Sequence, residues 1–220
     1  MKKAVIFDLD GLLADSESVS YRLYNGLLEA YGTGFSMETF IENCCGKTIV
    51  SNMRSMVKEY DLPISVEECC EWIRSRELDY LEQGVELKKG ARNLLVYLKK
   101  NSFKILLATS SYKERAVKML ELTGIEEFFD DMVFGTELKR GKPYPDIFLK
   151  AAEYAKEPPE HCLVLEDSEA GVQAAYAAGI DVICIPDLKQ PSKEYKEKAT
   201  AVMDSLDEVI GWLDLTNLSK

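Results

Sequence analysis

Short runs of consecutive apolar residues, each followed by polar or turn residues, recur along most of the chain. Runs in which apolar residues are continuous rather than alternating are typical of strands in a sheet that is buried on both faces. The pattern predicts five strands, at Ala4–Phe7, Lys104–Ala108, Met132–Phe134, Cys162–Leu165 and Val182–Ile185.

Between these runs, apolar residues recur at spacings of three and four, which is the period of an amphipathic helix. The spacing predicts helices at Ala91–Lys100, Lys113–Leu122, Ile147–Lys156 and Gly171–Ala178. Strands that alternate with helices are typical of right-handed crossovers and a parallel sheet. We therefore expect an α/β fold with a doubly wound parallel sheet.

The stretch after the first predicted strand has helical periodicity and no strand signal. Leu23, Leu27 and Leu28, for example, share one face of a predicted helix. We expect an all-helical insert at residues 16–86, within an α/β core formed by residues 1–15 and 87–220. An insert at this place would lie over the carboxyl ends of the strands, where open α/β sheets bind ligands.

Composition and charge exclude several classes of partner. The 220 residues carry a formal net charge of −11, which argues against a nucleic-acid or anionic membrane surface. Apolar runs fall short of the roughly 18 residues of a spanning helix, and the apolar stretch at the N-terminus is too short for a signal peptide. We expect a cytoplasmic monomer that binds neither nucleic acid nor membrane.

The six cysteines do not suggest a metal site. Two adjacent pairs, Cys44-Cys45 and Cys69-Cys70, lack the spacing of zinc ligands, and Cys162 and Cys184 fall in predicted strands. We expect all six to be reduced thiols.

The first candidate for chemistry is a pair of aspartates, Asp8 and Asp10, directly after the first predicted strand. At a strand end, residues two apart point the same way, so two like charges would lie together unless a cation neutralises them. Mg²⁺ prefers such oxygen ligands. One carboxylate can attack phosphorus and the other can act as general acid and base. The same residues are also ordinary in a turn or at a helix N-cap.

Two further candidates follow later strands. Thr109 and Ser110 end the second predicted strand, where a hydroxyl and backbone N–H groups can hold phosphate oxygens, although such a tract is also a common N-cap. Lys142 precedes Pro143, which disfavours helix at the lysine and holds it in an extended loop. An ammonium group there can neutralise the phosphate and the attacking carboxylate together, although most lysines are solvated.

A second pair of acids, Glu166 and Asp167, ends the fourth predicted strand. Acidic residues also favour a helix N-terminus through its dipole. Together with Asp8 and Asp10, however, the pair supplies the additional carboxylates that a magnesium site needs. All four candidate positions lie at the carboxyl ends of predicted strands, which is one edge of a parallel sheet.

In these motifs the chain resembles the haloacid dehalogenase-like hydrolases, in particular phosphatases with a helical cap. The resemblance implies a Rossmann-like core, Asp8 as nucleophile, Asp10 as acid and base, and Thr109 and Lys142 as catalytic partners. It implies Mg²⁺ held by Asp8, the Asp10 carbonyl and Asp167, with Glu166 close by. Gly11 and Ser110 are expected to contact the substrate, a small phosphorylated metabolite. Two groups of relatives resemble the chain further: the β-phosphoglucomutases and, more closely, the pseudouridine-5′-phosphatases.

In the cap, two cations are candidate substrate ligands. Lys47, within Gly46-Lys47-Thr48, falls where relatives place a substrate-facing loop, and Arg76 is a second candidate. A helix N-terminus at Thr48 and a solvated helix face at Arg76 are the alternatives. The mutases carry a histidine and an arginine where this chain has Ser20 and Ile49.

These departures favour hydrolysis of a sugar phosphate or a nucleoside 5′-monophosphate, such as pseudouridine phosphate, over phosphoryl transfer between sugars. A metal-free haloacid dehalogenase is disfavoured by Asp10 and by the Glu166-Asp167 pair. A non-catalytic binding module would have no reason to keep so many mutually repelling charges.

Overall fold

The structure is a computed structural model that describes residues 1–45 and 47–218. The chain divides into two compact units. The first consists of Met1–Asp15 and Glu86–Lys220, and the second of Ser16–Val85. Gly46, which belongs to one of the sequence motifs, lies outside the described residues.

The first unit contains a parallel sheet, to which the described residues contribute six strands in the order β3-β2-β1-β4-β5-β6. The expected doubly wound α/β fold is therefore confirmed. The strands are β1 (Ala4–Phe7), β2 (Lys104–Thr109), β3 (Asp131–Phe134), β4 (Cys162–Glu166), β5 (Asp181–Cys184) and β6 (Ala201–Val202).

Five of these strands agree with the sequence prediction to within a residue at each end, because each is a buried apolar run. The sixth, β6, was not predicted. It has only two residues, pairs with β5 alone at the edge of the sheet, and leaves Val202 exposed. A strand that is short and half-solvated has no apolar run that could reveal it.

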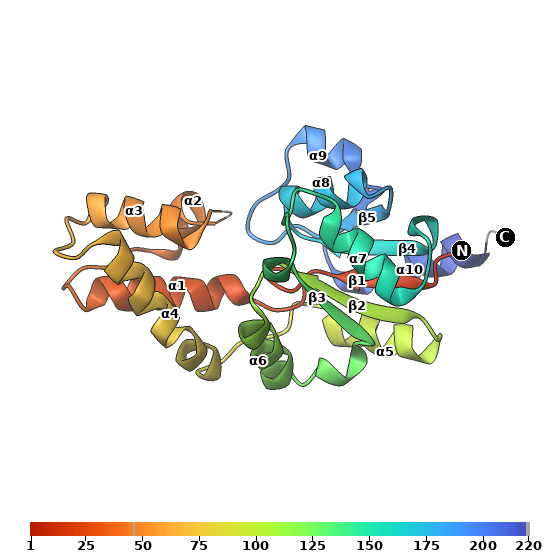
Figure 1. The fold of residues 1–220 in the computed structure, drawn as a ribbon, viewed down its shortest axis with the longest axis horizontal. Coiled ribbons are helices and arrows are strands. Elements are labelled where there is room, and N and C mark those ends of the chain that lie inside the picture. The colour runs from red at the N-terminus through yellow and green to blue at the C-terminus, as the bar shows by residue number, and fades with distance from the viewer. Residues whose placement is uncertain (46, 219–220) are drawn as a thin grey trace. The chain divides into compact units, whose positions relative to one another are not determined.

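Helices cover both faces of this sheet (Figure 1). On one face, Ile147 and Phe148 of α7 and Val172 of α8 pack against Ile6 and Val164 of the central strands. Elsewhere α5 packs against β2, and α10 packs against α5. The α-helices of this unit are α5 (Ala91–Lys100), α6 (Lys113–Thr123), α7 (Asp146–Ala155), α8 (Glu169–Ala177), α9 (Lys193–Lys198) and α10 (Leu206–Leu218). Short 3-10 helices lie at Glu126–Phe128, Gly135–Glu137 and Pro159–His161.

The helices of the second unit account for all the regular secondary structure among its described residues. Its helices are α1 (Ser16–Glu29), α2 (Met37–Asn43), α3 (Ile49–Glu59) and α4 (Val66–Glu82). They enclose an apolar core of their own that includes Leu27, Phe40, Met53 and Ile73. Side-chain hydrogen bonds cap the N-termini of three of these helices. Thr48 caps α3 and Ser36 caps α2, while Ser65 and Glu68 form a reciprocal capping box at α4.

The order of the strands brings distant segments of the chain to one edge of the sheet. Phe7 of β1 pairs with Leu107 of β2 on one side and with Leu165 of β4 on the other. The residues that follow these three strands are therefore neighbours. This edge includes the point between β1 and β4 where the strand order reverses, since β2 and β3 lie on one side and β4, β5 and β6 on the other. Such switch points are the usual ligand sites of open α/β sheets.

Candidate active site

Asp8 is the first residue after β1 and is the centre of the site. Its carboxylate is almost fully buried, and its Oδ1 accepts a short hydrogen bond from the ammonium group of Lys142. Lys142 also donates to the carbonyl of Ala108 at 3.1 Å and to Oε1 of Glu166 at 2.5 Å. Its side chain is only 6% exposed, so the alternative of a solvated surface lysine is wrong. The lysine instead links the ends of three adjacent strands.

Glu166, the last residue of β4, is completely buried and fully hydrogen-bonded. Besides Lys142, its Oε2 accepts from the backbone N–H groups of Asp167 and Ser168, each at 3.1 Å, and from the Ser168 hydroxyl at 2.9 Å. Four donors therefore fix the carboxylate in one orientation.

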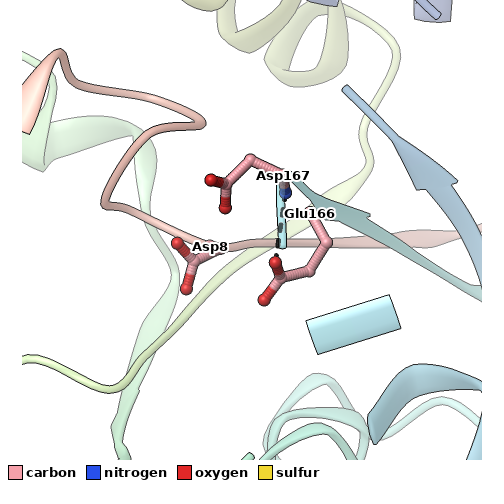
Figure 2. Close-up of side chains that lie close together, drawn as sticks. All are labelled: Asp8, Glu166 and Asp167. Carbon is pink, nitrogen blue, oxygen red and sulfur yellow. Dashed lines mark hydrogen bonds between the residues drawn. The ribbon is translucent and has the colours of Figure 1, made fainter. Parts of the chain in front are cut away.

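Asp167 follows Glu166 and points toward Asp8 (Figure 2). One ligand oxygen each from Asp8, Glu166 and Asp167 lies within 4.8 Å of the others. Opposite ligands of an octahedral Mg²⁺ are about 4.2 Å apart, so this spacing suits a cation of that size. Gly11 borders the cluster with a left-handed backbone, and a Cβ atom there would lie 2.5 Å from Oδ2 of Asp167. Only glycine combines that conformation with so close an approach.

The charges of the cluster also fit a divalent cation. The three carboxylates and the single ammonium of Lys142 have a formal net charge of −2. Burial, reinforced by repulsion from Glu166 and Asp10, raises the pKa of Asp8 to about 7 despite the opposing ammonium of Lys142. Burial and repulsion from Glu166 and Asp8 raise the pKa of Asp167 well above its usual range. The carboxylates of Asp8 and Glu166 outweigh burial and raise the pKa of Lys142. These groups fit Mg²⁺, whose charge would relieve the repulsion.

Asp10 is held differently from Asp8, by partners that the sequence did not reveal. Its Oδ1 accepts from Nη1 of Arg115 at 2.7 Å, and its Oδ2 accepts from the Ser111 hydroxyl at 2.7 Å. Arg115 lies on α6, about a hundred residues away in sequence, and an arginine at an ordinary helical spacing gave no signal of this contact. The two aspartates of one motif thus have separate environments.

Asp187 is a second residue that the sequence analysis missed. Its side chain is buried, forms an ion pair with Lys88, and is one of the charges that raise the pKa of Asp167. It also lines, with Gly11 and Leu12, a cavity of about 370 Å³ in the first unit. A lone aspartate in a loop after β5 carries no motif that would single it out.

Thr109 and Ser110 lie at the end of β2, as expected from the apolar run before them. Thr109 is buried, and its hydroxyl accepts from the backbone N–H of Ser111 at 3.1 Å, whereas Ser110 is exposed. The N-cap alternative is wrong, because α6 starts at Lys113 and its N-cap residue is Tyr112, which makes no side-chain capping bond.

The two cap cations lie in the second unit. Lys47 is exposed beside the N-cap Thr48, and Arg76 lies over the ring of Trp72 with 4.4 Å between its guanidinium carbon and the ring centroid. Thr48 therefore has the capping role considered for this loop. Contact of either cation with a substrate stays a prediction.

The remaining sequence expectations concern the cysteines and the membrane. All six cysteines are buried free thiols, as expected. Within residues 1–45 and 47–218, no helix combines the length and apolar character needed to cross a bilayer.

Comparisons with known proteins identify the family of this chain. A sequence model of the haloacid dehalogenase-like hydrolases matches residues 5–185. A Drosophila melanogaster protein named "Probable pseudouridine-5′-phosphatase" is 37% identical over 91% of this chain and 88% of its own length. The "Phosphorylated carbohydrates phosphatase" of Thermotoga maritima is 32% identical over 82% of this chain and 83% of its own. The "Beta-phosphoglucomutase" of Bacillus subtilis is 32% identical over 81% and 80%.

A solved structure supports the fold. A haloacid dehalogenase family hydrolase from Deinococcus radiodurans R1, determined with bound phosphate and sodium, matches with a TM-score of 0.84. The match covers 99% of this chain and 97% of that one at 24% identity. The family match and the relatives named as phosphatases confirm the prediction of an enzyme of the phosphatase class. The chain belongs to the haloacid dehalogenase-like hydrolase family.

Proposed function

We propose that this chain is a magnesium-dependent phosphatase that hydrolyses a small phosphate monoester through a phosphorylated Asp8. The observation that carries the proposal is the placement of Asp8. It is a buried carboxylate at the end of the central strand, paired with Lys142 and adjacent to Glu166 and Asp167. A nucleophile so placed meets a phosphate where positive charge is already available.

The chemistry divides into two displacements at phosphorus. In the first, an Oδ atom of Asp8 forms a bond to phosphorus while the bond from phosphorus to the leaving oxygen breaks. Protonated Asp10 gives its proton to that oxygen, so the product leaves as an alcohol. In the second, water attacks the phosphorus of the acyl phosphate, Asp10 takes the proton, and inorganic phosphate leaves while the Asp8 carboxylate is restored.

Lys142 and the metal residues have distinct parts in this proposal. Lys142 neutralises Asp8 before substrate binds and a phosphate oxygen afterwards. Thr109 and the backbone N–H groups after β2 bind further phosphate oxygens. Asp8, the Asp10 carbonyl and Asp167 would hold Mg²⁺, with Glu166 beside them, and the ion would supply positive charge for the phosphoryl oxygens.

The substrate class follows from the relatives and from the cap. Relatives named for pseudouridine phosphate and for phosphorylated carbohydrates suggest a nucleoside 5′-monophosphate or a sugar phosphate. We propose residues 16–86 as a cap that closes over the substrate, with Lys47 and Arg76 as candidate contacts. The chain passes between the two units twice, after Asp15 and before Glu86. These two connecting segments are hydrogen-bonded to each other, since the N–H of Asp15 donates to the carbonyl of Glu86 at 2.8 Å. Paired crossings of this kind suit a hinge.

The test is turnover of p-nitrophenyl phosphate with Mg²⁺ and with EDTA, together with an acid quench to trap the intermediate. We expect phosphate release that depends on Mg²⁺, and a phosphorylated peptide that contains Asp8. The Asp8→Asn variant should show neither. Undiminished turnover in EDTA would contradict the metal requirement, and phosphate release by Asp8→Asn near the wild-type rate would contradict the covalent route.

A mutase is the second candidate, because one relative is named a β-phosphoglucomutase. Ser20 and Ile49 stand where the resembled mutases carry the histidine and arginine that suit a second phosphate. We therefore expect β-glucose 1-phosphate with a trace of bisphosphate to yield free phosphate. Efficient conversion to glucose 6-phosphate, followed by NMR, would establish the mutase instead.

A further inference from the structure

We infer that Arg115 is a positioning residue that holds Asp10 ready for proton transfer to the leaving group. The inference rests on the proposed function, in which Asp10 is the general acid and base. Arg115 contacts Asp10 through an ion pair. Neither the sequence motifs nor the proposed chemistry assigns this arginine a role.

The contacts form a closed triangle between three side chains. Nη1 of Arg115 lies 2.7 Å from Oδ1 of Asp10 and 2.5 Å from the Ser111 hydroxyl oxygen. That hydroxyl in turn lies 2.7 Å from Oδ2 of Asp10. Both oxygens of the carboxylate are thus fixed by donors from one direction, the start of α6.

The two partners differ in how far they are buried. The Arg115 side chain is 9% exposed, whereas the Asp10 side chain is 32% exposed. Arginine is almost never buried without a partner, so the guanidinium is anchored and the aspartate is oriented against it. The exposed part of the carboxylate is then the part that a substrate or a water can reach.

The backbone alone would not orient Asp10 in this way. The residue lies beyond the end of β1 and is followed by Gly11, whose φ of +78° starts a tight turn. An aspartate on such a loop is free to rotate unless its carboxylate is bound. The ion pair to Arg115 removes that freedom, and an oriented general acid is worth about 10²–10⁴ in rate.

Two aryl phosphates separate positioning of an acid from general damage. The leaving group of p-nitrophenyl phosphate departs readily as an anion, whereas that of phenyl phosphate, with a pKa of about 10 for a phenol, benefits from a proton. The second-order constant kcat/KM reports this first displacement. Arg115→Met should lower kcat/KM for phenyl phosphate by about 10²-fold, as expected when a catalytic group moves by about 1 Å. The loss for p-nitrophenyl phosphate should be at least about tenfold smaller.

Matched variants complete the test. Arg115→Lys restores a cation and should recover part of the selective loss. Arg92→Met is the control, because that arginine binds the backbone carbonyls of Thr123 and Gly124 at the end of α6 and should leave both constants unchanged. In Asp10→Asn, the further change Arg115→Met should add no selectivity between the two substrates.

The outcomes distinguish this inference from the proposed function beneath it. Equal losses on both substrates in Arg115→Met, or no loss, would overturn the positioning role. If Arg115→Met does not fold, Ser111→Ala, which leaves the ion pair in place, should show a smaller loss with the same selectivity, and no selectivity there would also overturn it. If Asp10→Asn itself spares phenyl phosphate, the assignment of Asp10 as acid fails, whatever Arg115 does.

Discussion

Replacing Gly171 by alanine should destabilise the protein, although alanine is the better helix former. Gly171 lies in the first turn of α8, directly beneath the carboxylate of Glu166. A Cβ atom at this position would lie 1.8 Å from the Cδ of Glu166 and 1.9 and 2.2 Å from its two carboxylate oxygens. The backbone itself tolerates alanine, so the collision with this one side chain decides the outcome.

The magnitude follows from how firmly Glu166 is held. The carboxylate has no exposed surface and accepts hydrogen bonds from Lys142, from two backbone N–H groups and from the Ser168 hydroxyl. To make room it must give up several of these bonds, and disrupting a buried, paired charge costs about 3–5 kcal/mol. The higher helix propensity of alanine stabilises the folded state by about 1 kcal/mol relative to glycine. We therefore expect a net loss of about 2–4 kcal/mol in the free energy of unfolding.

Urea denaturation measures this loss, and the chain offers a matched control. Gly211 is also helical, in α10, but a Cβ atom there would meet no atom within 4 Å apart from its chain neighbours and the backbone of its own helix. Gly211→Ala should therefore raise the free energy of unfolding by about 0.5–1 kcal/mol. The two alanine variants should move in opposite directions. If Gly171→Ala proves as stable as the wild type, the buried carboxylate is not fixed as described and the reasoning fails.

Two further predictions concern the acidic cluster in the absence and in the presence of the proposed Mg²⁺. Because the folded state raises the pKa of Asp8 from 3.8 to about 7, the metal-free folded protein binds more protons than the unfolded chain in that interval. The free energy of unfolding of this metal-free protein should therefore fall as the pH rises from about 4 to about 7. Asp8→Asn should make that fall with pH less steep, which urea denaturation at several pH values will measure. Equal slopes in the variant and the wild type would contradict the raised pKa of Asp8. Asp167→Asn should stabilise the metal-free protein, because it removes a repelling charge. The same change should weaken Mg²⁺ binding, which calorimetry will measure, and an unchanged affinity would exclude Asp167 from the metal site.

The positions of the site residues along the chain were predictable because they follow from local signals. The strands before Asp8, Thr109 and Glu166 are continuous apolar runs, and in a parallel sheet the ends of such runs meet at one edge. The contact between Lys142 and Asp8 agrees with the expectation that a lysine held in this loop by Pro143 neutralises the attacking carboxylate. The two-residue strand β6 lay below the length at which periodicity carries information.

The partners of individual carboxylates were not predictable in the same way. The contact between Asp10 and Arg115 joins residues 105 positions apart, and it depends on how α6 leaves the sheet after β2. Sequence periodicity places Arg115 on a helix but does not say which residue the buried face of that helix meets. The ion pair between Lys88 and Asp187 joins residues 99 positions apart and is hidden for the same reason.

The spacing of Asp8 and Asp10 suggested two like side chains on one side of a strand end, yet the fold gives them different environments. Asp8 is buried among Lys142 and two other carboxylates, and its pKa is raised to about 7. Asp10 is about one-third exposed and is tied to Arg115. When two carboxylates have such different surroundings, one can act as nucleophile toward phosphorus while the other exchanges protons with a leaving group or water. Under the proposed function, the division of roles would therefore come from α6 and its arginine as much as from the motif itself. Under the proposed function, a chain that kept both aspartates but lost this arginine would keep the carboxylate that attacks phosphorus and lose the orientation of the proposed acid.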